Sequence, residues 1–261
     1  MRAMPDTAVL LHGFGGTKRG WDLVAGRLDG REGYTPLALD LRGHGAARAQ
    51  RPVTFEACVA DVLGAAPPRF ALCGYSMGGR VALHVALAAP ERVGHLILVA
   101  TTAGIEDPAE RSARRDADEA LAAWAEAATI EAFADRWASK QLFADAPPEA
   151  AAFARADMLR NDPSALAAVL RGIGTGSMQP LWGRLGELRM PATVLAGERD
   201  AKFIALGTRL AGALPDAELV VVPAAGHGIA REAPEAIAEV LRPPVRASSA
   251  PRSRRSPATG Q

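Results

Sequence analysis

The chain has 261 residues, of which 49% are hydrophobic and 23% charged, and its formal net charge is +1. This composition is typical of a folded α/β domain, and no apolar run reaches the roughly 20 residues that a membrane helix needs. The two cysteines, Cys58 and Cys73, lack the spacing of metal ligands and are too few for a disulfide framework. No signal peptide pattern is visible at the N-terminus, so we expect a cytoplasmic protein with no metal.

Six short apolar runs, bounded by Gly, Pro or Asp, recur along the chain. They cover residues 8–11, 36–41, 70–73, 96–100, 193–197 and 219–222. Because these runs are continuous rather than alternating, they predict strands buried on both faces, as in a parallel sheet. Helical patterns lie between them, for example over 79–93 and 232–242. The alternation predicts a doubly wound, mostly parallel α/β fold of about six strands, with N-terminal strands short or absent.

The connection between the runs 96–100 and 193–197 is longer than a single crossover requires, at over 90 residues. It is rich in alanine, and its apolar residues repeat at a spacing near 3.6, for instance over 130–143 and 165–173. This pattern predicts a helical cap over the sheet. We therefore expect a core formed by residues 1–103 and 191–242 and a cap formed by residues 104–190.

The final segment, residues 243–261, is rich in Pro, Ser and Arg. It holds four arginines and no acid, so the rest of the chain carries a net charge of −3. Such a composition predicts a disordered tail. Nucleic-acid binding by this tail is an alternative to a simply solvated segment, but the body of the chain has no basic stripe, and we expect no nucleic-acid or membrane partner.

The stretch GYSMGGR, residues 74–80, follows the run FALC and opens a helical pattern. Glycines two residues before and after Ser76 relieve crowding at a sharp strand-to-helix turn, which is the context of a nucleophile elbow. The alternative is a serine with only a structural role in the turn. The context favours Ser76 as a catalytic serine.

A catalytic serine needs a base and a carboxylate that orients the base. His227 follows the run 219–222 and Asp200 follows the run 193–197, so both lie at carboxyl ends of strands, where open α/β sheets build their sites. Taken singly, His227 is better explained as a surface loop histidine and Asp200 as a helix N-cap. The order Ser, Asp, His favours a triad, with Asp107 as the rival acid.

Two glycine-containing loops follow the first and second runs. In HGFGG, residues 12–16, the glycines permit a tight turn, and we expect the backbone N–H groups of Phe14 and Met77 to form an oxyanion hole. The alternative is a glycine turn with no ligand. In DLRGHG, residues 40–45, we expect His44 to hold the loop by hydrogen bonds and to take no part in catalysis.

Arg80 lies four residues after Ser76, in the first turns of the predicted helix. A cation at this end of a helix is disfavoured by the helix dipole, by up to about 1 kcal/mol. Its position therefore suggests an anionic ligand, and a guanidinium group binds both oxygens of a carboxylate. A surface arginine, or one paired with an acid such as Asp116, is an equally good interpretation of this residue alone.

These motifs resemble the α/β-hydrolase fold family. A closer similarity, over residues 10–241, is to the SHCHC (2-succinyl-6-hydroxy-2,4-cyclohexadiene-1-carboxylate) synthase family of menaquinone biosynthesis, and it includes GYSMGGR, GERDAKF, ERSARRDAD, FADRWASKQLFA and MLRNDPSALAAVLRGIGTGSMQPLW. This resemblance implies a lyase without a cofactor. The substrate would be a cyclohexene with carboxylate, succinyl and enolpyruvyl groups, which loses a ring proton and expels pyruvate.

The resemblance also implies roles for individual residues. By motif, the residues that hold the substrate are Arg80, Arg114, Arg160, Trp137 and Tyr75, and the triad is Ser76, Asp200 and His227. By themselves, Arg114 and Arg160 are better explained as solvated helix charges. In the mechanism that we expect, His227 makes Ser76 basic enough to take the ring proton, and no acyl-serine is required.

The chain departs from the family pattern in two places. The family often continues the histidine loop as GHxxHxE, whereas GHGIARE has Ala230 at the second histidine position, and the strands that usually precede HGF are short or absent. Two other functions stay open: a serine carboxylesterase or C–C bond hydrolase of the same fold, and a ligand-binding module without catalysis. The expected partner is a small polycarboxylate, and the oligomeric state is left open.

Overall fold

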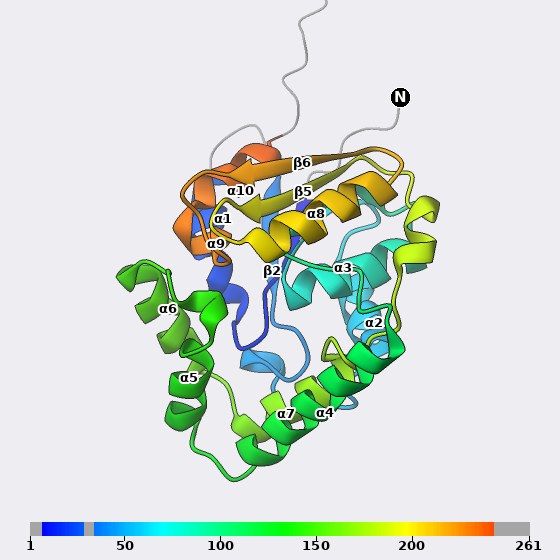
Figure 1. Cartoon of the computed structure of the whole chain (residues 1–261). Coiled ribbons are helices and arrows are strands. Elements are labelled where there is room, and N and C mark those ends of the chain that lie inside the picture. The colour runs from blue at the N-terminus through cyan, green and yellow to red at the C-terminus, as the bar shows by residue number, and fades with distance from the viewer. Residues whose placement is uncertain (1–6, 29–33, 243–261) are drawn as a thin grey trace, which may run out of the picture.

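The computed structural model describes residues 7–28 and 34–242 (Figure 1). The segment before Thr7, where strands were predicted to be short or absent, and the tail 243–261 lie outside these residues. Within them, six strands form one sheet in the order β2-β1-β3-β4-β5-β6, with every neighbouring pair parallel. The strands are β1 (Thr7–Leu11), β2 (Thr35–Leu39), β3 (Phe70–Tyr75), β4 (Val93–Val99), β5 (Ala192–Gly197) and β6 (Ala217–Val222). The predicted doubly wound α/β class is confirmed.

The sheet is covered on both faces by helices, which explains the continuous apolar runs. Alternate residues of a strand point to opposite faces: Val9 and Leu72 join one buried cluster, while Leu10 and Cys73 join the other. The first cluster packs against α2 (Phe55–Ala65), α3 (Met77–Ala88) and α8 (Ala201–Ala213). The second packs against α1 (Asp22–Leu28), α9 (Ile229–Glu232) and α10 (Pro234–Val240).

Two predicted helical stretches were too long. The helical pattern over 79–93 continues beyond the end of α3 at Ala88 and reaches the start of β4 at Val93. The helix ends earlier than predicted because Pro90 cannot continue it. The pattern over 232–242 lies across the end of α9 and all of α10. The break falls at Ala233, whose backbone lies outside the helical region at φ −147° and ψ 61°, because a residue before proline is disfavoured in the helical region.

The segment between β4 and β5 is helical, as its spacing predicted. It contains α4 (Pro108–Ala125), α5 (Ile130–Ala138), α6 (Pro148–Met158) and α7 (Pro163–Ile173), with short 3₁₀ turns η3 (Gln141–Phe143) and η4 (Trp182–Glu187). In Figure 1, α4 and α7 lie below the sheet and α5 and α6 lie to one side. These helices share their own apolar cluster, which includes Phe133, Met158 and Leu166. Residues 104–190 are called the cap segment below.

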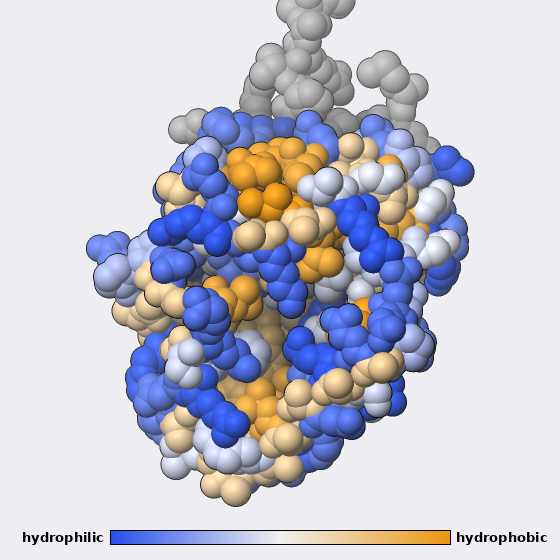
Figure 2. Space-filling model, viewed as in Figure 1, coloured by the Kyte–Doolittle hydropathy of each residue, from blue (hydrophilic) through white to orange (hydrophobic). Residues whose placement is uncertain are grey.

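The space-filling view shows one face of the molecule hollowed between the sheet, with its helices, and the cap segment (Figure 2). Hydrophilic side chains surround the opening, and apolar side chains line its deeper part. None of the helices in the described residues is long and apolar enough to cross a membrane. The hollow lies at the carboxyl ends of the strands, where the catalytic motifs were expected.

Candidate active site

Ser76 occupies a sharp turn between β3 and α3. Its backbone has φ 51° and ψ −109°, a region that residues other than glycine rarely adopt. The turn is packed so tightly that a Cβ atom on Gly74 would lie 2.3 Å from the carbonyl oxygen of Gly78, and one on Gly78 would lie 2.2 Å from that of Leu11. Only glycine fits at both positions, and the strained turn holds Ser76 at the end of β3.

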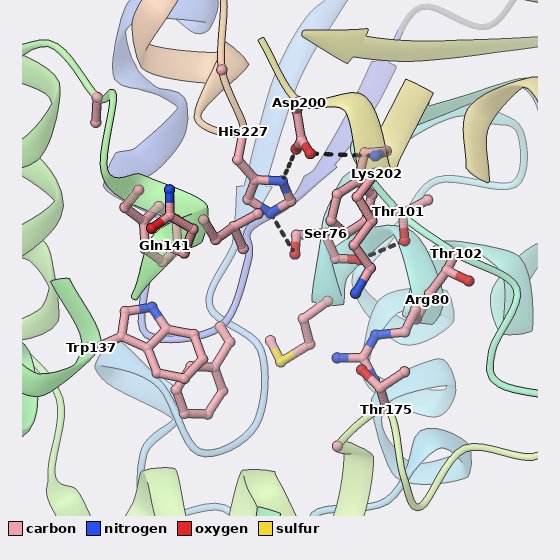
Figure 3. A pocket seen from close by; sticks show the side chains of 18 of the residues that line it. Ser76, Arg80, Thr101, Thr102, Trp137, Gln141, Thr175, Asp200, Lys202 and His227 are labelled. Atoms are coloured by element: carbon pink, nitrogen blue, oxygen red, sulfur yellow. Dashed lines mark hydrogen bonds and ion pairs between the residues drawn. The ribbon is translucent and has the colours of Figure 1, made fainter. Parts of the chain in front are cut away.

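Ser76, His227 and Asp200 form one continuous line of hydrogen bonds (Figure 3). His227 Nδ1 donates to Asp200 Oδ2 over 2.7 Å, and His227 Nε2 lies 3.3 Å from Ser76 Oγ. Both His227 and Asp200 are buried. Asp200 also caps α8, since its Oδ1 accepts from the backbone N–H of Phe203. The triad and the N-cap interpretations of Asp200 are therefore both satisfied, one by each carboxylate oxygen.

Asp107, the rival acid, has a different place. Its side chain caps α4 by accepting the backbone N–H of Glu110 over 2.7 Å, and it is exposed. Pro108 at the first helical position completes this N-terminal capping pattern. Asp107 is therefore a helix cap, and the sequence pattern that suggested it as a rival acid reflected the start of a helix.

The HGFGG loop is fixed by two buried histidines, His12 and His44. His12 Nδ1 donates to the carbonyl of Gly13, and its Nε2 accepts the N–H of Leu41 over 3.0 Å. His44 Nε2 accepts the N–H of Gly15 over 3.1 Å, while its Nδ1 donates to a neighbouring carbonyl. Both rings must therefore be neutral. Burial lowers the pKa of each, and His12 lowers that of His44 further.

The backbone N–H groups of Phe14 and Met77 are available to a ligand. Met77 is the first residue of α3, where an N–H has no partner within the helix, and no group of the described residues accepts a hydrogen bond from the N–H of Phe14. Both residues line the same cavity as Ser76. Both N–H groups are therefore free to donate to a ligand in this cavity, as an oxyanion hole requires.

The cap segment is tied to the HGFGG loop by buried polar groups. Asp157 accepts both the N–H and the hydroxyl of Thr17, over 2.7 and 2.6 Å. Asn161 donates to the carbonyl of Gly15 over 2.8 Å and accepts the N–H of Gly45 over 3.0 Å. Sequence reasoning missed both residues, although Asn161 lies in the stretch MLRNDPSALAAVLRGIGTGSMQPLW that carried the family resemblance and Asp157 directly precedes it. Their partners lie more than a hundred positions away, so no local pattern marks them.

A cavity of about 490 Å³ lies between the triad and the cap segment. Its residues come from the loops after β1, β3, β4, β5 and β6 and from the cap segment. Those drawn and labelled in Figure 3 are Ser76, Arg80, Thr101, Thr102, Trp137, Gln141, Thr175, Asp200, Lys202 and His227. Of these, Thr101, Thr102, Gln141, Thr175 and Lys202 were not predicted from the sequence as site residues. Gln141, Thr175 and Lys202 lie in stretches that carried the family resemblance, which was the available signal, whereas Thr101 and Thr102 lie in none of them.

Arg80 is buried in the wall of this cavity, with only 7% of its surface exposed. Its guanidinium donates to the carbonyl of Ile173 over 2.7 Å, and it forms no ion pair within the described residues. The alternatives of a surface arginine and of one paired with the exposed Asp116 are therefore wrong. Burial and the positive charge of Arg114 lower the pKa of Arg80 to about 10, so the side chain stays charged at neutral pH.

The other two predicted arginines differ from Arg80. Arg114 lines the cavity, but its Nε is 2.9 Å from the buried Asp118 and its side chain is 41% exposed. Arg160 does not line the cavity; it lies 3.7 Å from Asp157 and is 48% exposed. The structure therefore brings Arg80 and Arg114 together with the triad and leaves Arg160 outside.

The two predicted aromatic residues lie on either side of the triad. Trp137 lines the cavity, and its ring centroid is 4.5 Å from that of Phe14. Tyr75 packs against His227 with a centroid distance of 5.3 Å, and it lines a smaller cavity of about 170 Å³ rather than the main one. Burial raises the pKa of Tyr75, as do the charges of Glu232 and Asp200. Its hydroxyl is therefore neutral.

The charged side chains that line the main cavity are of both signs: Arg80, Arg114, Arg199 and Lys202 against Asp145, Asp200 and Glu232. Lys140 lies over the ring of Trp137, 4.9 Å from its centroid, and its pKa is lowered by burial and then by Arg114 and Arg136. Arg80 experiences the same repulsion from Arg114. Cations that disfavour one another in the free protein are suited to an anionic ligand, which would relieve this repulsion.

A parallel sheet with a serine elbow, an aspartate after β5 and a histidine after β6 defines the α/β-hydrolase class of protein. The sequence matches the Alpha/beta hydrolase family over residues 8–240, and the chain belongs to this family.

Within this class, the chain groups with the 2-succinyl-6-hydroxy-2,4-cyclohexadiene-1-carboxylate synthases. One of them, from Klebsiella pneumoniae, is 34% identical over 242 residues, which are 89% of this chain and 91% of the relative. The structure of MenH from S. aureus superposes with a TM-score of 0.85 at 30% identity, covering 92% and 93% of the two chains. An enol-lactonase from Burkholderia xenovorans is more distant, with a TM-score of 0.75 at 26% identity over 92% and 90% of the chains.

Proposed function

We propose that this protein is a carbon–oxygen lyase that forms 2-succinyl-6-hydroxy-2,4-cyclohexadiene-1-carboxylate in menaquinone biosynthesis. Its substrate would be 2-succinyl-5-enolpyruvyl-6-hydroxy-3-cyclohexene-1-carboxylate, from which it eliminates pyruvate. The synthases that resemble it over most of their length support this reaction. So do the cations of the cavity, because this substrate carries three carboxylates.

The reaction begins with removal of a proton from the ring carbon that bears the succinyl group. This carbon is acidic because it is adjacent to the succinyl ketone. Ser76 Oγ takes the proton while its own proton passes to His227 Nε2, and Asp200 holds the ring of His227 in the required tautomer. The negative charge moves to the ketone oxygen, where the N–H groups of Phe14 and Met77 stabilise the enolate.

The electron pair then returns to the ring. A double bond forms between carbons 2 and 3, the existing double bond shifts to carbons 4 and 5, and the bond from carbon 5 to the enolpyruvyl oxygen breaks. Pyruvate leaves as its enolate and takes up a proton. Ser76 keeps the ring proton as its hydroxyl, and the proton held on His227 passes to the departing enolate, directly or through water, so no covalent intermediate is needed and no cofactor takes part.

The cations of the cavity would bind the carboxylates. Arg80 is the main candidate, because its guanidinium is buried, charged and without an acidic partner in the described residues. Arg114 would add a second contact from the cap segment, and Trp137 and Tyr75 would bound the ring and the triad. We propose that residues 104–190 act as a cap over the core, since they supply the outer wall of the cavity.

The observation that carries this proposal is the buried guanidinium of Arg80, which lines the cavity of a complete triad and has no acidic partner among the described residues. The test is an assay with the cyclohexene substrate, in which pyruvate release and the absorbance of the new diene are followed together. We expect both signals to appear at the same rate and to be lost in Ser76→Ala. Absence of pyruvate release from the wild-type protein would refute the proposed function.

Hydrolysis of an ester or lactone is the second candidate. The triad, with the N–H groups of Phe14 and Met77, would serve acyl transfer equally well, and this observation favours hydrolysis. The enol-lactonase also shares the fold. In that case Ser76 would become acylated, and p-nitrophenyl esters would be turned over faster than the polycarboxylate. Comparing kcat/KM for the two substrates with the same preparation separates the candidates.

A further inference from the structure

The carboxylate of Glu232 holds the backbone on both sides of the catalytic histidine. Oε2 accepts the N–H of Gly226 over 2.7 Å, and Oε1 accepts the N–H of Gly228 over 3.0 Å. His227 lies between these two glycines in the sequence. One side chain therefore holds a backbone N–H on each side of His227 and restrains the loop from which the imidazole projects.

The same carboxylate is connected to the loop of the catalytic acid. Arg199 Nη2 donates to Glu232 Oε2 over 3.0 Å, and Arg199 directly precedes Asp200. Two further hydrogen bonds join the loops, since Arg199 N–H donates to the carbonyl of Ala225 and Glu198 accepts the N–H of Ala224. Glu232 is the acceptor that joins the Arg199 side chain to the peptides on both sides of His227.

The loop is shaped to let the carboxylate approach. A Cβ atom on Gly228 would lie 2.9 Å from Glu232 Oε1, and one on Gly226 would lie 3.3 Å from the same carboxylate. Glu232 is itself almost fully buried, with 4% of its side chain exposed, whereas Arg199 is 40% exposed. A buried carboxylate is costly unless its lone pairs are satisfied. Here two N–H groups and a guanidinium satisfy them.

We propose that Glu232 is a positioning residue for the triad, which keeps His227 within reach of both Ser76 and Asp200. The reason lies in the two hydrogen-bond distances. His227 lies 2.7 Å from Asp200 Oδ2 but 3.3 Å from Ser76 Oγ, so the hydrogen bond to Ser76 is the one most easily lost. A displacement of about 1 Å at such a contact can cost about 10²-fold in rate. This inference concerns the triad used by the proposed function and does not depend on which substrate is bound.

The test uses two readouts on purified, full-length Glu232→Ala and Glu232→Gln. The first is the rate at which a fluorophosphonate labels Ser76, which reports the pairing of Ser76 with His227 without any natural substrate. The second is kcat and KM for pyruvate release. We expect Glu232→Ala to lower both the labelling rate and kcat about 10- to 100-fold and to change KM less than about threefold. Glu232→Gln keeps the shape but can present only one acceptor oxygen, so we expect an intermediate loss.

Two control variants separate positioning from a general effect of charge. Glu235→Ala removes an exposed carboxylate three residues away, and we expect wild-type labelling. Arg199→Gln removes the ion pair but leaves both N–H contacts, and we expect less than a tenfold loss, because a half-exposed ion pair contributes little. If Glu232→Ala fails to fold, Glu232→Gln supplies the same comparison.

Some outcomes would overturn the inference. A folded Glu232→Ala or Glu232→Gln protein that labels at the wild-type rate, even with a lower Tm, would show that the carboxylate is only structural. An equal loss in Glu235→Ala would show a nonspecific charge effect. If instead the wild-type protein releases no pyruvate but labelling still falls in the Glu232 variants, the proposed reaction fails and the positioning role of Glu232 stands.

Discussion

The two halves of the active site are held in different ways. On the sheet side, Ser76, Asp200 and His227 are held at strand ends by hydrogen bonds of 2.7 and 3.3 Å and by a strained turn at Ser76. On the cap side, Arg114 lies on a helix with 41% of its side chain exposed and an acidic neighbour of its own. Arg80 lies on α3, on the sheet side, but its guanidinium donates a hydrogen bond to the carbonyl of Ile173 in the cap segment. The difference indicates that the sheet side supplies the chemistry and the cap side adjusts which substrate is bound.

The largest effect should come from the sheet side. Ser76→Ala removes the proposed base, and we expect kcat for pyruvate release to fall about 10²- to 10⁴-fold, the range for loss of a positioned proton acceptor. KM should change little, because the cations that bind the carboxylates remain. Steady-state kinetics with the cyclohexene substrate gives both constants. Full activity in this variant would refute the assignment of Ser76 as the base.

The next effect should come from Arg80→Met, which keeps the volume and removes the charge. Loss of a charged hydrogen-bonding partner of a carboxylate costs about 1.5–3 kcal/mol, so we expect kcat/KM to fall about 10- to 100-fold. The Tm should stay the same or rise, because an unpaired buried charge is destabilising. Arg184→Met, at an exposed arginine paired with Glu187, is the matched control and should leave kcat/KM unchanged. A wild-type kcat/KM in Arg80→Met would show that Arg80 does not bind a carboxylate of the substrate.

Breaking the connection between the halves should have a smaller effect. Asn161→Ala removes the two buried contacts to Gly15 and Gly45 and leaves their backbone groups without partners. We expect the free energy of unfolding to fall by about 1–3 kcal/mol, and kcat to fall about tenfold because Gly15 follows the oxyanion donor Phe14. Urea unfolding and kinetics measure the two effects. A stability loss with unchanged kcat would show that the cap does not position the oxyanion hole.

Within the cap, the two exposed arginines should differ. Arg114→Ala should raise KM about three- to tenfold, because this residue lines the cavity. Arg160→Ala should change KM less than about twofold, because Arg160 lies outside the cavity beside Asp157. Equal effects of the two substitutions would mean that the cap moves on binding and brings Arg160 to the substrate, as the family resemblance implied.

A pH effect on stability should originate at the sheet side. His44 is neutral in the folded protein and its pKa is lowered well below that of the unfolded chain, so the unfolded chain binds a proton first as the pH falls. The contribution of His44 is therefore fully present above about pH 6.5 and is lost as the pH drops below that value. His44→Gln keeps an acceptor for Gly15 but cannot titrate. We expect its free energy of unfolding to decline less between pH 7 and pH 5 than that of the wild type, as urea unfolding at several pH values would show.

Much of the fold could be predicted from local pattern. The six apolar runs all became strands of one parallel sheet, because a strand covered by helices on both faces must be apolar along its whole length. The ends of helices were less well predicted: the pattern over 79–93 continued through Pro90 into β4. Apolar spacing alone does not distinguish a helix from the buried strand that follows it.

The sequence by itself determined the class of chemistry for two reasons. The sharp turn at Ser76 needs glycines around it, and a parallel sheet brings the loops after β3, β5 and β6, which hold the serine, the aspartate and the histidine, to the same edge. Only the tertiary structure decided which arginine faces the triad, that Asp107 is a helix cap, and that Glu232 holds the loop of His227. The physical reason is that a side chain's partners across the cavity lie far away in the sequence. Arg80 contacts Ile173 and Asn161 contacts Gly15 only because the chain between them has folded.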